Sequence, residues 1–137
     1  KRLRGIAIRQ ELTDEWKQRN IEGKKEFGIL TNEISKATFG KTVEEYKEFK
    51  GLKNQNLRDH MTDLETIFTM LGEKATTEIT VARDSKGLDE CKDSARTGGM
   101  IASNAKKELE TKTGKLVVTN DNFLDITSKK KLKNNKS

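Results

Sequence analysis

The sequence feature that most constrains the fold is the absence of proline from all 137 residues, in a chain whose apolar residues recur at steps of three and four. Proline breaks helices because it lacks the N–H donor and clashes with the preceding turn. Steps of three and four place apolar side chains on one face of a helix. The sequence therefore predicts an all-α fold, a compact multi-helix bundle.

Two helices are expected in the first 40 residues. The first has Ile8, Leu12 and Trp16 on its apolar face, and Gly23 is a plausible stop for it. The second runs from Phe27 to Ala37. Gly40 then suits the left-handed conformation that often ends a helix.

Two Thr-x-x-Glu pairs predict helix starts further along the chain. Thr42 and Glu45 open a short helix that reaches Phe49. The second pair, Thr62 and Glu65, predicts a break inside a longer apolar stripe. That stripe consists of Leu57, Met61, Leu64, Phe68 and Leu71. We expect it to continue past Gly72, with a bend or as one helix.

The last expected helix, from Leu88 to a stop at Gly114, has a seam of small residues. Small side chains allow a neighbouring helix to approach closely, so Gly98 and Gly99 indicate either a close crossing or a kink. The seam contains Cys91, Ala95, Gly98, Ala102 and Ala105. Residues 116–118 predict a short extended segment.

Composition favours one thin-cored domain, residues 1–127, followed by a disordered basic tail, residues 128–137. Hydrophobic residues make up 31% of the chain and charged residues 36%, against roughly 45–50% apolar residues in ordinary domains. The formal charge of +6 arises at the ends, which carry eight basic residues, so the other 20 basic and 22 acidic residues sum to −2. A nucleic-acid-binding domain is usually basic in its folded body.

The sequence contains no apolar run long enough for a membrane span, and its first four residues lack the apolar stretch of a signal peptide, so we expect neither feature. A single cysteine, Cys91, agrees with a reducing compartment. We therefore expect a cytoplasmic protein. The chain begins at Lys1, and we expect it to be a segment of a longer protein.

No catalytic or metal-binding motif is complete, and we expect neither an enzyme nor a cofactor. Gly40-Lys41-Thr42 resembles the end of a phosphate-binding loop, but that motif requires a glycine where Ser35 stands. His60 has no second histidine or cysteine to complete a metal site. Cys91 lies on the apolar seam and is interpreted as structural.

The most unusual segment is basic and polar, from Lys47 to Thr62. Lysines three residues apart fall on one face of a helix, and we expect them to be exposed. The candidate binding residues for a protein partner or nucleic acid are Lys47, Lys50, Lys53, Asn56 and Arg58. The alternative is a turn decorated with lysines for solubility.

This segment, YKEFKGLKNQNLRDHMTDLE (46–65), resembles the "KGL…LRDHMT…E" region of the DNA-damage-inducible protein D family and related phage antirepressors. Three further stretches resemble the same family in the same order. They are IAIRQELTDEWKQR (6–19), FGILTNEISKATFG (27–40) and ARTGGMIASNAKKELETKTGKLVVT (95–119). In that family this region follows an N-terminal BRO-type domain, which this sequence does not contain.

The resemblance implies a role in the SOS response to DNA damage or in prophage control, with a RecA filament or a phage repressor as protein partner. It implies no cofactor and leaves the oligomeric state open, a dimer included. The alternative hypothesis is a nucleic-acid-binding domain that uses the basic segment and the lysine tail. The sequence between the basic ends is near neutral in charge, and the chain has few aromatic residues. Both features favour the protein-binding hypothesis.

Overall fold

The computed structural model describes residues 2–120, and all regular secondary structure within them is helical. The helices are α1 (Arg2–Gln18), α2 (Gly23–Phe39), α3 (Val43–Phe49), the 3-10 helix η1 (Leu57–His60), α4 (Asp63–Arg83) and α5 (Gly87–Thr113). The predicted all-α bundle is confirmed for this range. Residues 116–118 form no strand there. The predicted disordered tail, 128–137, lies outside the described residues.

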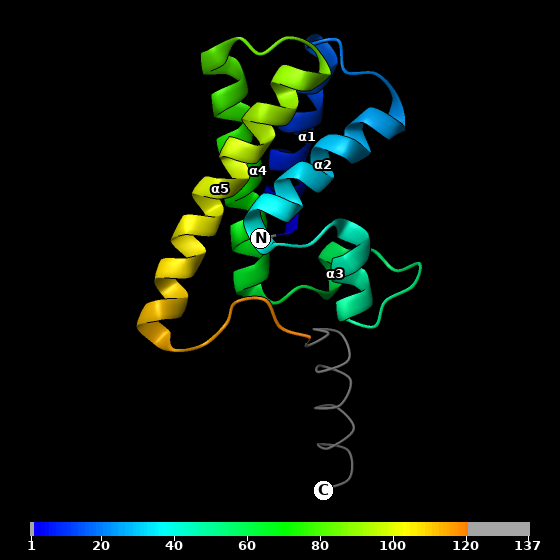
Figure 1. The fold of residues 1–137 in the computed structure, drawn as a ribbon. Helices are drawn as coiled ribbons and strands as arrows, with labels where there is room; N and C mark the ends of the chain where they lie inside the picture. The colour runs from blue at the N-terminus through cyan, green and yellow to red at the C-terminus, as the bar shows by residue number, and fades with distance from the viewer. Residues whose placement is uncertain (1, 121–137) are drawn as a thin grey trace, which may run out of the picture.

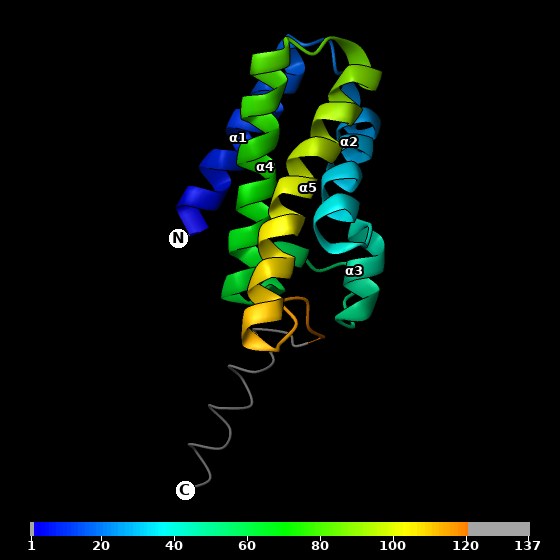
Figure 2. The same ribbon diagram turned by 60° about the vertical axis from the view of Figure 1, so that its left-hand side comes forward.

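Helices α4 and α5 form a long antiparallel pair, with α1 packed on α4 and α2 packed mainly on α5 (Figures 1 and 2). The α1–α2 and α4–α5 connections meet at one end of this bundle. Arg19 joins them, because its Nη1 lies 2.6 Å from Asp84 Oδ1 and its carbonyl accepts a 3.2 Å hydrogen bond from the Gly87 N–H. Helices α3 and η1 lie toward the other end of the bundle.

The two glycines in α5 mark a close helix crossing, and α5 continues through them as one helix. A Cβ atom added at Gly98 would lie 2.7 Å from the Thr76 backbone nitrogen in α4. A Cβ atom added at Gly99 would lie 2.8 Å from the Ile34 carbonyl oxygen in α2. At these two glycines the backbone of α5 therefore lies directly against the backbones of α4 and α2. The small-residue seam predicts such close packing.

The apolar stripe predicted for α4 is wrong in part, because Leu64 and Leu71 are 44% and 36% exposed. The buried residues of α4 include Thr76, Thr77 and Thr80 instead, and Thr76 faces Gly98 of α5. Each hydroxyl donates to the carbonyl four residues earlier, at 2.7, 3.2 and 2.6 Å. These bonds satisfy the hydroxyl groups, so threonine can occupy an interface too tight for leucine.

Helix boundaries follow the predicted caps with one exception. Both Thr-x-x-Glu pairs form capping boxes, at Thr42 and at Thr62, so the predicted break before α4 is confirmed. The prediction that Gly23 ends α1 is wrong, because Gly23 is the first residue of α2. Helix α1 ends earlier because Asn20 adopts the left-handed conformation, at φ 67°, which asparagine tolerates better than most residues.

Two apolar clusters form the core. The first joins α1, α2 and α5 and contains Leu12, Trp16, Ile21, Leu30, Ile34, Cys91 and Ala95. The second surrounds α3 and contains Tyr46, Leu52, Leu57 and Met61. Val118, just after α5, packs on the second cluster. Between residues 2 and 120, no helix combines the length and the apolar character that crossing a bilayer requires.

Candidate binding cavity

A cavity of about 320 Å³ lies between α2, α3, the segment that leads into η1, and α4. Its apolar lining residues are Ile34, Phe39, Val43, Leu57 and Met61. Its charged lining residues are Arg9, Lys47, Arg58 and Glu73. Asn54, Gln55 and Asn56 add side-chain amides to the same lining. The cavity thus combines apolar walls with several hydrogen-bonding groups, as small ligand sites do.

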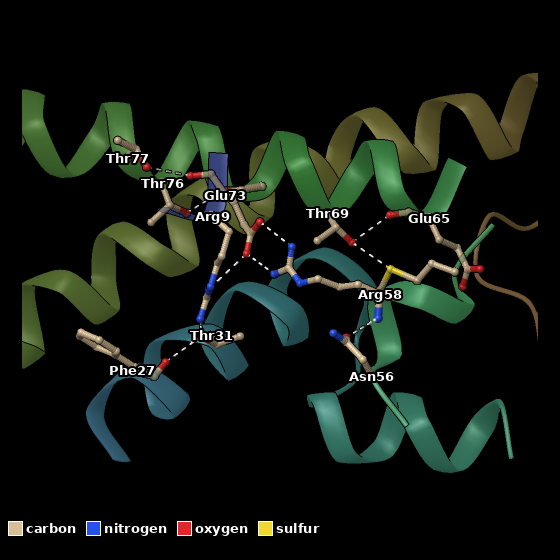
Figure 3. Close-up of polar contacts among 12 residues, drawn as sticks. Arg9, Phe27, Thr31, Asn56, Arg58, Glu65, Thr69, Glu73, Thr76 and Thr77 are labelled. Atoms are coloured by element: carbon tan, nitrogen blue, oxygen red, sulfur yellow. Dashed lines mark hydrogen bonds and ion pairs between the residues drawn. The ribbon is translucent and has the colours of Figure 1, made fainter. Parts of the chain in front are cut away.

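A buried carboxylate organises the charged wall. Glu73 is 1% exposed, and the guanidinium groups of Arg9 and Arg58 both bind its carboxylate, as Figure 3 shows. Arg58 approaches it with two nitrogens, Nη1 at 3.0 Å from Oε1 and Nη2 on Oε2. Arg9 Nη1 lies 3.2 Å from the same Oε2. Bidentate contact of this kind fixes the plane of the guanidinium as well as its position.

Arg9 is held at three points, which links the cavity to the main core. Besides Glu73, its Nη2 donates a 2.7 Å hydrogen bond to Thr31 Oγ1. The Thr31 hydroxyl in turn donates a 2.7 Å hydrogen bond to the Phe27 carbonyl oxygen. The guanidinium carbon also lies 5.3 Å from the centre of the Trp16 ring, a distance that permits cation–π attraction.

Local sequence determines how Arg58 reaches the cavity. The Asn56 side chain accepts a 3.0 Å hydrogen bond from the Arg58 backbone N–H and so caps η1. Leu57 is buried in the second core cluster and anchors this turn. The capping box at Thr62 then starts α4 two residues after η1 ends. The turn therefore presents Arg58 toward Glu73.

Burial and the shared carboxylate shift the two arginines in opposite directions. Burial lowers the pKa of Arg9, and attraction to Glu73 offsets this only in part. Burial also acts to lower the pKa of Arg58, but its hydrogen bonds and charge attraction to Glu73 outweigh burial and raise it. Both stay charged, because arginine is not deprotonated in proteins. Three cations against one carboxylate leave the lining with an excess charge of +2.

Three of the five predicted binding residues line this cavity. They are Lys47, Asn56 and Arg58. Lys53 is exposed in the turn after α3 and is not part of the lining. Its backbone N–H donates to Gln55 Oε1 at 2.7 Å, so this turn is ordered by its own side chains.

Lys50 requires a correction, since the expectation that it lies exposed beside Lys47 and Lys53 is wrong. Its side chain is 0% exposed, and Nζ lies 2.8 Å from Glu65 Oε1. Nζ also donates to the Thr119 carbonyl oxygen at 3.0 Å, and the Tyr46 hydroxyl donates to Glu65 Oε2. The physical reason is that the chain after α5 returns to α3, where the Thr119 carbonyl oxygen accepts from Lys50 and Val118 packs on the second core cluster.

The buried Tyr46–Glu65–Lys50 network is therefore structural. Burial raises the pKa of Tyr46, and its hydrogen bond to Glu65 raises it further. Glu65 also closes the capping box of α4, because its Oε1 accepts from the Thr62 N–H at 2.9 Å. The network joins α3, the start of α4 and the end of the described chain.

Sequence reasoning missed Arg9, Thr31 and Glu73. A signal existed for Glu73, because it follows Glu65 by eight residues and Gly72 by one, on the face that packs inward. A carboxylate on the buried face of a helix predicts a buried cationic partner. No comparable signal identified Arg9, which lies 64 positions before Glu73 in the sequence.

Comparison with protein-family models, with curated proteins and with solved structures found no match for this chain. Within residues 2–120, no group of three or more histidine, cysteine, aspartate or glutamate side chains is arranged to hold a metal ion.

Proposed function

We propose that this chain is a non-enzymatic protein-binding module of the SOS response or of prophage control, acting in the cytoplasm. It contacts a RecA filament or a phage repressor, and no cofactor takes part. The observation that carries the proposal is the position of Lys47, Asn56 and Arg58. They belong to the segment with the strongest family resemblance, and they line the same cavity.

The exposure of the aromatic residues supports a protein partner over single-stranded nucleic acid. Single strands are usually bound on exposed aromatic rings. Trp16 and Tyr46 are fully buried and Phe68 is 7% exposed. Phe49 is 42% exposed, but Lys41 Nζ already lies 4.6 Å from the centre of its ring. No row of free aromatic rings is present in the described part of the chain.

The test measures binding of the purified chain to RecA filaments and to a phage repressor, with and without nuclease, at increasing salt. The variants are Lys47→Gln, which changes the cavity lining, and Lys53→Gln, a matched exposed lysine outside it. We expect capture of one partner that survives nuclease, weakens at least tenfold in Lys47→Gln and stays within twofold of wild type in Lys53→Gln.

A nucleic-acid-binding domain would behave differently in the same assay. Contacts with several phosphates lose affinity steeply as salt rises, because counterions are released on binding. A shaped protein interface depends less on salt. Binding to DNA alone, with a steep salt dependence and equal loss in the two lysine variants, would contradict the proposal.

A further inference from the structure

We propose that the cavity binds a carboxylate carried on a short aliphatic stem. The charge of the lining favours an anion. Glu73 offers two oxygens, and Arg9 and Arg58 already occupy them. The remaining lining residues are neutral or cationic, so nothing else in the described lining offsets the excess charge of +2. An incoming anion would supply the missing charge.

Unused donors also favour an anion. Arginine has five N–H donors in a rigid fork, and Arg58 directs two of its nitrogens to Glu73. Its remaining N–H groups are available in a guanidinium whose orientation Glu73 has already fixed. Among the described residues, the Lys47 ammonium has no ion pair. A ligand anion thus meets donors that need little rearrangement, which favours binding.

Size and polarity of the walls define the stem. A volume of about 320 Å³ is at the low end of ligand sites, roughly 300–1,000 Å³. Ile34, Phe39 and Met61 provide an apolar wall that a bare inorganic anion would leave unused. Each methylene group buried there would strengthen binding roughly fourfold. A stem of a few carbon atoms uses both the volume and the wall.

The apolar wall distinguishes between possible anions. The excess charge of +2 in the lining attracts monoanions and dianions alike. Only a ligand with an aliphatic stem also uses the apolar wall, and each buried methylene group adds to its binding. We therefore expect a compact anion such as phosphate, which lacks a stem, to bind more weakly than a carboxylate on a short stem.

Two sources can present this chemistry: a free short-chain carboxylic acid, or a glutamate side chain of the partner protein. The second source rests on the proposed function, whereas the first is independent of it. The probe that separates ligand chemistry from partner identity is butyrate, with butyramide as its uncharged counterpart and inorganic phosphate as an anion without a stem.

The experiment follows nuclear magnetic resonance shifts of the full chain during titration with each probe. We expect butyrate to shift residues around Arg58 with saturation, and butyramide and phosphate to bind at least tenfold more weakly. Lys47→Gln should weaken butyrate at least fivefold, and Lys53→Gln should leave it within twofold. Absence of butyrate binding, equal binding of phosphate, or equal loss in both lysine variants would overturn the proposal.

Competition then distinguishes the two sources. If excess butyrate displaces a captured partner, the partner's glutamate side chain occupies the cavity. If butyrate binds and the partner is unaffected, the ligand is a free carboxylic acid. Lys47-dependent partner capture without butyrate binding overturns this inference and leaves the proposed function standing. Butyrate binding without capture of any partner supports the inference and contradicts the proposed function.

Discussion

Replacing Gly98 with alanine should destabilise the protein, although alanine is the better helix former. The new Cβ atom would lie 2.2 Å from Thr76 Oγ1, 2.7 Å from its nitrogen and 2.8 Å from its Cα. Two of these atoms belong to the backbone of α4, so no side-chain rotation relieves the overlap. Helices α4 and α5 would have to separate over the crossing.

The magnitude follows from two opposing contributions. Forcing extra atoms into a packed interface costs about 1–3 kcal/mol, and backbone contacts this short place Gly98→Ala at the upper end. The helix propensity of alanine returns about 1 kcal/mol. The net loss is about 2 kcal/mol in the free energy of unfolding. At about 4 °C per kcal/mol for a chain of this size, Tm should fall by roughly 8 °C.

Gly28 is the matched control, since it lies inside α2, is exposed, and would place no atom within 4 Å of its new Cβ. Gly28→Ala should raise stability by about 0.5–1 kcal/mol from propensity alone. Urea and thermal unfolding, followed by circular dichroism, measure both variants. A Gly98→Ala variant as stable as Gly28→Ala would refute the close α4–α5 crossing.

Three further predictions concern buried polar groups. Lys50→Gln should lower the free energy of unfolding in urea by about 3 kcal/mol, because it leaves Glu65 buried without its cation. The control Lys53→Gln should stay within about 0.5 kcal/mol of wild type. Equal effects of the two variants would contradict the buried Lys50–Glu65 pair. Glu73→Gln should cost about 2 kcal/mol, less than the loss of one partner from a fully buried pair. The reason is that the Arg9 and Arg58 side chains are 27% and 37% exposed. Strict additivity with Arg58→Gln in a double-mutant cycle would show that Glu73 and Arg58 do not interact. Burial raises the pKa of the Cys91 thiol, so iodoacetamide should react far more slowly with the native protein than with the unfolded chain. The free energy of unfolding should also fall as pH rises above the unfolded thiol pKa of about 8.5. Equal alkylation rates would place Cys91 at the surface.

Helix positions and several boundaries were predictable because they depend on local chemistry. Both capping boxes, at Thr42 and Thr62, involve residues three positions apart, and such contacts form whatever the rest of the chain does. Gly40 and Gly114 end α2 and α5 with φ of 75° and 71°. The small-residue seam of α5 likewise predicted close packing.

Tertiary structure decided which side chains are buried and which residues meet at the cavity. Leu64 and Leu71 of α4 are the better apolar candidates but are exposed, whereas Thr76 is fully buried at the close crossing with Gly98. Lys50 resembles its neighbouring lysines in sequence, and only the segment that ends at Thr119 and the facing Glu65 make it a buried partner. Arg9 and Arg58 are 49 positions apart, and no local pattern records that both bind Glu73. Charge pairing across such separations depends on how the helices pack, and that arrangement exists only once the whole bundle has formed.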